Sequence, residues 1–179
     1  MGPSFPGETG PLMDKIRSLA GDPTSAAKEL GNEFQPEQFQ QLVLAARNFN
    51  YQTPDLALTA LEAARGLLGR VESLEKRAQL MTTLIRVWGD VEGEVEPKVY
   101  REGFLLVDDL RQTPGPSEQT STISAGPLRS AADNLERTLV AEYARDDFDA
   151  TMKYIAGLSD NKVKLEMLLN IVQRFRQPF

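Results

Sequence analysis

Apolar residues recur at helical spacing along most of this chain, and one pattern occurs three times with an aromatic residue in its last position. Each copy has four apolar positions spaced +3, +4 and +3, which places their side chains on one face of an α-helix. Because only 7% of the chain is aromatic, the shared aromatic indicates a common structural unit. The first, second and third stripes are Phe39, Leu42, Ala46 and Phe49; Ala78, Met81, Ile85 and Trp88; and Leu165, Leu168, Val172 and Phe175.

Helix start and stop signals predict eight or nine helices and no strand. Thr53-Pro54 starts one helix, Ser130 with Asp133 resembles a capping box for another, and Gly89 is expected to end the helix that carries the second stripe. The predicted helices cover about 12–20, 23–31, 36–49, 54–67, 73–88, 97–111, 130–145, 147–157 and 160–176.

Composition marks two segments that we expect to lack regular structure. Residues 1–11 are rich in Gly and Pro, and we expect them to be disordered. Residues 112–128 are dominated by Pro, Gly, Ser and Thr, which predicts a mobile loop. We expect 12–176 to form a single α-helical repeat domain that contains this loop, because 179 residues suffice for one core or a short array.

Two predicted helices match each other in pattern as well. The apolar positions of 54–67 correspond to those of 147–157, so 54–89 and 147–176 look like versions of one helical hairpin. The segment between them, 97–145, would be the same unit with the loop inserted. The sequence therefore predicts a stack of antiparallel helix pairs.

The repeat length points to a known architecture. The first two stripes begin 39 residues apart, from Phe39 to Ala78, between the periods of about 34 for tetratricopeptide and about 40–47 for HEAT or armadillo repeats. Over about 36–176 the pattern resembles bacterial α-helical repeat proteins of the tetratricopeptide or HEAT-like kind. The resemblance implies an all-α fold of antiparallel helix pairs stacked as a short right-handed α-α superhelix, and a tendency to bind protein partners. It transfers no functional residue.

Composition narrows the range of functions. The chain contains no Cys and no His, which excludes disulfides, thiolate nucleophiles, His-based triads, and thiolate or imidazole metal ligands. Its net charge is -6, and its 20 basic residues are interleaved with 26 acidic ones. Nucleic-acid binding needs clustered basic residues, so we expect none. No stretch approaches the roughly 20 apolar residues of a membrane span, so we expect no membrane insertion.

Acidic clusters are the candidates for acid–base catalysis or metal binding, but a solvated loop, a helix start and exposure near the predicted mobile loop account for them. The segment from Asp90 to Glu96 lacks the EF-hand spacing and fits a solvated loop. Acids at a helix start are favoured by the helix dipole, and they cap the free amides of the first turn. We therefore predict no catalytic, cofactor-binding or metal-binding residue. The remaining clusters are Asp108 and Asp109, near a helix end, and Asp146, Asp147 and Asp149, at a helix start.

Two arginines are the candidate partner-binding residues. Arg47 and Arg86 occupy the same position, two residues before the final aromatic of the first and second stripes. If both face one groove, they would bind carboxylates of a peptide partner; otherwise their stems cover the edge of the core and pair locally. Trp88, the only tryptophan, is expected in the core.

The sequence favours a non-enzymatic scaffold or module that binds a protein or peptide. Two alternatives remain open. One is a carrier of apolar small molecules, in which Ala-rich helices and Met81, Met152 or Met167 line a pocket. The other is a carboxylate-dependent hydrolase or lyase in a helical fold, which needs at least two buried, converging acids.

The chain ends leave compartment and assembly open. The N-terminus has neither a basic start nor an apolar run, so it does not predict a signal peptide, and the compartment is cytoplasmic or, if an upstream segment is missing, periplasmic. The last helix has no polar cap of the kind that terminal repeats carry. We therefore expect self-association through the C-terminal helix, or a continuation of the chain beyond the sequence given.

Overall fold

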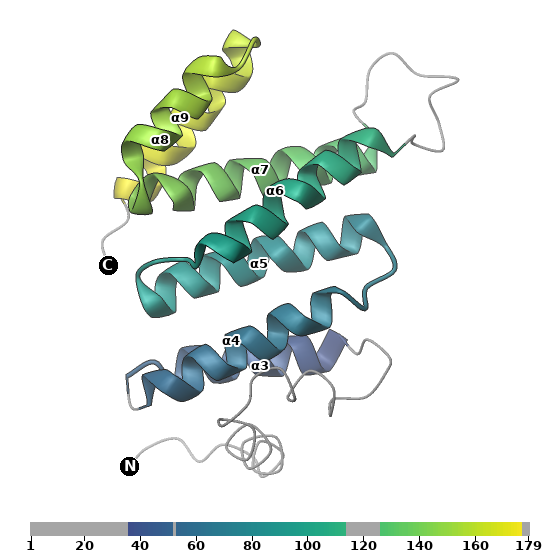
Figure 1. Ribbon diagram of the computed structural model, residues 1–179, viewed down its shortest axis with the longest axis vertical. Helices are drawn as coiled ribbons and strands as arrows, with labels where there is room; N and C mark the ends of the chain where they lie inside the picture. The colour runs from purple at the N-terminus through teal and green to yellow at the C-terminus, as the bar shows by residue number, and fades with distance from the viewer. Residues whose placement is uncertain (1–35, 52, 114–125, 177–179) are drawn as a thin grey trace. The chain divides into compact units, whose positions relative to one another are not determined.

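The protein is all-helical in the part described by its computed structural model, residues 36–51, 53–113 and 126–176 (Figure 1). This part contains seven helices and no strand, which confirms the predicted all-α class. The segment 1–11 and the helices expected within 12–31 lie outside the described residues. The helices are α3 (Pro36–Phe49), α4 (Pro54–Leu68), α5 (Leu74–Glu92), α6 (Pro97–Gln112), α7 (Pro127–Asp146), α8 (Phe148–Gly157) and α9 (Asn161–Arg176).

Contacts between residues divide the chain into two compact units, Met1–Val71 and Glu72–Phe179. Of the described helices, α3 and α4 belong to the first unit and α5 to α9 to the second. The single domain expected over 12–176 and the helix pair expected over 54–89 both cross this division, and both stay predictions.

Side-chain caps explain where several helices begin. Ser73 and Asp147 each accept a hydrogen bond from the amide three residues further on, over 3.3 and 2.9 Å. Asp160 accepts from the amides two and three residues on, over 2.7 and 3.3 Å. Each cap satisfies an amide that has no partner within its helix, and such a cap stabilises a helix by about 1 kcal/mol.

In the first unit, α3 packs against α4 through its predicted apolar face. All four residues of the first stripe are buried, as the sequence predicts. The facing helix is rich in alanine, and Ala57, Ala60 and Ala64 are fully inaccessible. Small side chains allow the two helix axes to approach closely.

The second unit is organised around α7, which contacts each of the other four helices, α5, α6, α8 and α9 (Figure 1). The second stripe, on α5, is fully buried, and Trp88 lies in the core as predicted. A separate apolar cluster joins α7 to the C-terminal helices; it consists of Val140, Ala144, Ile155, Met167 and Ile171.

Helix α5 continues past the predicted stop at Gly89. Its C-cap is Gly93, whose φ of +79° is the left-handed conformation that favours glycine at a helix end. Gly89 is instead buried within the helix, where a Cβ atom would lie 2.9 Å from Glu142 Oε2. The glycine therefore serves close packing against α7 rather than termination. As a result, Asp90 to Glu92 are helical, and the predicted acidic loop contains only 93–96.

Helix α7 begins earlier than the predicted capping box. It starts at Pro127, and the Ser130 amide donates to the Gly126 carbonyl over 3.1 Å as in any helix, so Ser130 is not the cap. Proline is favoured at the first helical position because no amide hydrogen there needs a partner. The loop predicted at 112–128 is shortened at both ends by α6 and α7, and its residues 114–125 lie outside the described residues.

The third stripe does not face the core, which contradicts the prediction that it matches the first two. Leu165, Leu168, Val172 and Phe175 are all exposed, and Met167 and Ile171 are buried in their place. The helix therefore has two apolar sides, and the pattern alone could not decide which one packs inward. The inward side is the one that α7 and α8 can cover with Val140, Ala144 and Ile155.

Candidate functional site

The outward side of α9 is the largest group of exposed apolar side chains on one described helix. We call it the α9 outer face: Leu165, Leu168, Leu169, Val172 and Phe175. Their spacing of i, i+3, i+4, i+7 and i+10 gives one continuous stripe along the helix. Their exposed fractions run from 36% at Leu168 to 58% at Leu165. Exposed apolar patches of this kind mark interaction sites in folded proteins.

Ion pairs hold α9 in this orientation from its other side. Glu166 pairs with Arg137 of α7 over 2.5 Å. Near the other end, Arg174 Nη2 donates to Asp90 of α5 over 2.7 Å and to Glu142 of α7 over 3.3 Å. With Met167 and Ile171 in the core, these contacts fix the rotation of α9 about its axis. The α9 outer face is thus presented to solvent by the packing of the rest of the helix.

Buried Glu142 is the acid that Arg174 shares with a second arginine, Arg145. Its carboxylate lies over Gly89 and accepts hydrogen bonds from Arg145 over 3.2 Å and from Arg174. A buried carboxylate requires such cationic donors, because its charge is otherwise costly to remove from water. Substitution of Gly89, Arg145 or Arg174 would therefore disturb the junction between α5, α7 and α9.

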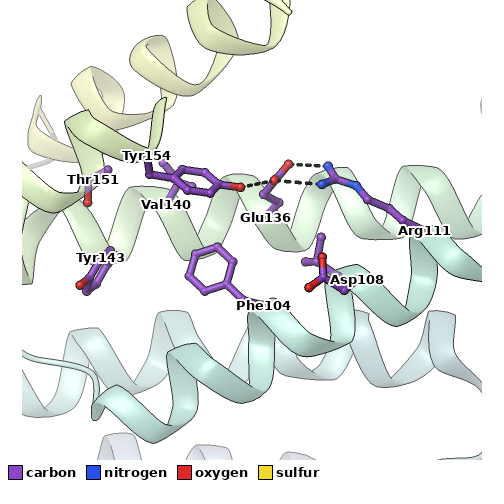
Figure 2. A pocket seen from close by; sticks show the side chains of 9 residues that line it. Phe104, Asp108, Arg111, Glu136, Val140, Tyr143, Thr151 and Tyr154 are labelled. Atoms are coloured by element: carbon purple, nitrogen blue, oxygen red, sulfur yellow. Dashed lines mark hydrogen bonds and ion pairs between the residues drawn. The ribbon is translucent and has the colours of Figure 1, made fainter. Parts of the chain in front are cut away.

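A second candidate site is a pocket between α6, α7 and α8 (Figure 2). Its volume is about 330 Å³, at the lower end of the range of small-molecule sites. Figure 2 shows Phe104 and Tyr154 next to each other in its lining, with their ring centroids 5.8 Å apart and their planes tilted by 54°. We call it the α6–α8 pocket; it is lined by Phe104, Val107, Asp108, Arg111, Glu136, Val140, Tyr143, Thr151 and Tyr154.

Buried Glu136 links two walls of the α6–α8 pocket. Arg111 donates to its two carboxylate oxygens over 3.2 and 2.7 Å, and the Tyr154 hydroxyl donates to Oε1 over 2.5 Å (Figure 2). Burial and the hydrogen bond to Glu136 raise the pKa of Tyr154 above its usual value of 10.0. The hydrogen bond to Glu136 likewise raises the pKa of Arg111. Tyr154 and Arg111 therefore both keep their protons at neutral pH.

A second contact between a tyrosine and a carboxylate lies at the C-terminal end of α7. The Tyr100 hydroxyl donates to Asp146 Oδ2 over 2.6 Å, and the Val95 amide donates to the same oxygen over 3.1 Å. Burial, followed by this hydrogen bond, raises the pKa of Tyr100. Asp146 therefore ties the loop before α6 to the end of α7, whereas the cap of α8 is Asp147. Both acids belong to the cluster that the sequence predicts at a helix start.

The two predicted partner-binding arginines lie on different units. Arg47 is exposed on α3 in the first unit. Arg86 is exposed on α5 in the second, and its Nη2 donates to Thr138 Oγ1 of α7 over 3.3 Å. The local contact of Arg86 matches the alternative in which such arginines pair at the edge of the core. Their shared role in one groove stays a prediction.

The predicted acidic clusters do not come together as a catalytic pair. Asp108 and Asp109 are both exposed on α6, and only Asp108 lines the α6–α8 pocket. Asp149 is exposed in the first turn of α8. Among the described residues, no three Asp or Glu side chains are grouped closely enough to hold a metal ion.

Sequence reasoning missed the two buried acids of α7, although a signal was present. Glu142 is seven residues after Leu135 and three after Leu139, so it occupies a position of their apolar stripe. Glu136 likewise falls between Ala132 and Val140 on the neighbouring stripe. A charged residue at such a position predicts a buried ion pair, but the partner arginines on α6 and α9 are distant in sequence and could not be assigned.

Comparisons with known proteins do not assign this chain to a family. No protein-family model matches the chain, and neither the curated proteins nor the solved structures show significant similarity to it. None of the described helices combines the length and hydrophobicity that crossing a membrane requires.

Proposed function

We propose that this protein is a non-enzymatic interaction module that binds an amphipathic, acidic helix of a partner protein on the α9 outer face. The observation that carries the proposal is the second apolar side of α9, where five large side chains are exposed along one stripe. Such a stripe matches the helix-in-groove mode of recognition, in which anchors are spaced i, i+3, i+4 and i+7.

The charge around the α9 outer face selects the partner. Lys162, Lys164 and Arg176 flank it, and the helix carries four basic residues and one acidic residue, although the whole chain has a net charge of -6. A partner helix with acidic flanks would therefore be attracted and oriented by α9.

The same charges disfavour a second copy of this chain as the occupant. Two α9 helices that pair through their outer faces would place basic ends beside basic ends in an antiparallel arrangement, and basic sides together in a parallel one. Self-association through this helix, which the sequence analysis expected, is thus the competing outcome of the test below.

We also propose that the chain is a short helical-repeat array, with helix pairs stacked as a right-handed α-α superhelix of the tetratricopeptide or HEAT-like kind found in bacteria. What supports this is the order of contacts in the second unit: α5 contacts α6 and α7, and α7 contacts α8 and α9. A helix that packs against the next two along the chain is typical of serial stacking. In such an array, the face of α9 on which another helix pair would stack is left open to a partner.

The buried acids argue for binding rather than catalysis. Glu136 pairs with Arg111 and Tyr154, and Glu142 pairs with Arg145 and Arg174 in a separate network. Carboxylates that serve acid–base chemistry need a shared cleft in which their pKa values diverge. Both networks instead join helices to one another. The predicted roles of Arg47 and Arg86 in partner binding remain compatible with the proposal.

Two synthetic peptides test the proposed partner chemistry. One is an amphipathic helix about as long as α9, with leucines at i, i+3, i+4 and i+7 and glutamates beside them; the other has lysines in place of the glutamates. Fluorescence anisotropy with the full chain should show that the acidic peptide binds at least about tenfold more tightly, and that added salt reduces the difference. Equal affinities, or tighter binding of the basic peptide, would contradict the proposal.

Two leucine variants locate the binding surface. Leu165→Glu places a charge on the α9 outer face and should raise the Kd of the acidic peptide about tenfold, because buried leucine contacts are lost. Leu105→Glu is the matched control on α6: Leu105 is 57% exposed and Leu165 58% exposed, and the charge change is the same. Light scattering tests the alternative occupant, a second copy of this chain. If the wild type is a dimer and Leu165→Glu is a monomer, a second copy binds the α9 outer face, which would contradict the proposed partner.

A further inference from the structure

The α6–α8 pocket combines an aromatic wall with an excess of negative charge. Phe104 comes from α6, Tyr143 from α7 and Tyr154 from α8, so rings from three helices converge on it (Figure 2). Val107 and Val140 complete an apolar lining. The rings are fixed by their neighbours: the Tyr143 ring packs edge-on against Tyr100, with their centroids 4.9 Å apart.

The charges of the α6–α8 pocket sum to a net negative value. Glu136 and Asp108 each contribute a carboxylate, and Arg111 contributes the single positive charge. Arg111 is engaged by Glu136 in a two-point contact and lies 3.6 Å from Asp133 as well. The guanidinium is therefore already neutralised, whereas Asp108 is exposed and lines the same pocket, one turn after Phe104 on α6 (Figure 2). An anionic ligand would meet more repulsion than attraction here.

We propose that the α6–α8 pocket binds a small organic cation, an alkylammonium group whose carbon substituents contact the rings while its charge faces Asp108. The faces of Phe and Tyr rings attract a cation through their quadrupoles, and methyl or methylene groups on the nitrogen lower its desolvation cost relative to a bare ammonium ion. A neutral apolar ligand would use the rings but gain nothing from Asp108. This site shares no residue with the α9 outer face.

Choline and its neutral carbon isostere, 3,3-dimethylbutan-1-ol, provide a matched pair of probes, because they have nearly the same shape and differ in charge. In titration calorimetry with the full chain at low salt, choline should bind at least about tenfold more tightly than the alcohol. Equal binding of the two probes would overturn the proposal in favour of a carrier of neutral apolar molecules, and the absence of binding by both would overturn it altogether.

Neighbouring residues on α6 provide matched variants. Asp108→Asn should weaken choline binding about fivefold to tenfold, whereas Asp109→Asn, one residue along and also exposed, should leave it unchanged. Phe104→Leu should weaken it by a similar factor, whereas Leu105→Ala should not. Thermal unfolding of each variant checks that the fold is retained. Equal effects of Asp108→Asn and Asp109→Asn would show that choline responds only to overall charge, which would overturn the site.

Discussion

At the scale of single residues, polar and small side chains decide how the helices of the second unit meet. Glu136 and Glu142 lie inside the unit, and each is held by an arginine from another helix, Arg111 from α6 and Arg174 from α9. Because a buried carboxylate without such a partner is strongly unfavourable, these pairs specify which helices pack together. Glycines at the crossings then set how closely they approach.

Gly103→Ala should destabilise the protein by about 1 kcal/mol, even though alanine is the better helix former. A Cβ atom at Gly103 would lie 2.6 Å from Leu139 Cδ2 of α7, and Leu139 is fully buried and cannot move away freely. Urea unfolding measures the change. Gly157→Ala on α8 is the control: apart from its chain neighbours and the backbone of its own helix, nothing lies within 4 Å of its Cβ position, so the stability of this variant should equal that of the wild type or exceed it by up to about 0.5 kcal/mol. Equal effects of the two variants would contradict the close approach of α6 to α7.

Stability should fall as the pH rises above about 10. Burial and the hydrogen bond to Glu136 raise the pKa of Tyr154 in the folded state above 10.0, its value in the unfolded chain. Below that pH the folded and the unfolded chain both carry the phenol proton, so this group does not make the free energy of unfolding depend on pH. Above that pH the unfolded chain loses the proton first, which favours unfolding. Tyr100 has the same direction of shift.

The Tyr154→Phe variant isolates this contribution. Its free energy of unfolding, measured with urea between about pH 9 and 11, should decline less steeply than that of the wild type, because one of the two shifted phenols is gone. The slope is the informative quantity, since the variant also loses the hydrogen bond to Glu136 at every pH. An unchanged slope would show that the Tyr154 hydroxyl is not buried and hydrogen-bonded in solution as it is in the structure.

At the scale of elements, α9 is the helix whose orientation matters most for function. Met167→Ala should lower the free energy of unfolding by about 2–5 kcal/mol, because Met167 is buried against α7 and α8. Leu165→Ala, two residues earlier on the α9 outer face, should change it by less than about 0.5 kcal/mol. Thermal and urea unfolding of both variants measure the difference. The reverse order would mean that the third stripe packs inward as the sequence pattern suggested.

The helices themselves could be predicted from sequence, whereas the face that each one buries could be predicted only in part. Capping residues such as Asp147 and Asp160 act on amides within three residues, so their effect is visible locally. The stop at Gly89 and the inward side of α9 were predicted wrongly because both depend on α7. Gly89 accommodates Glu142, and Met167 is buried because α7 and α8 lie over it. Such contacts between distant segments leave no local signal.

At the scale of the whole molecule, charge and apolar surface are distributed unevenly. The chain has a net charge of -6, yet α9 is basic and carries the α9 outer face. In contrast, the α6–α8 pocket is negative and lined by aromatic rings. The two sites therefore favour ligands of opposite charge, an acidic helix on one and a small organic cation in the other.

The central claim is that the α9 outer face binds a partner helix, and backbone amide NMR of the full chain with the acidic amphipathic peptide tests it most directly. We predict that the largest shifts fall on α9 at Leu165, Leu168, Leu169, Val172 and Phe175, with α3 and the α6–α8 pocket little changed. Binding without shifts on α9, or shifts concentrated on another helix, would contradict the account.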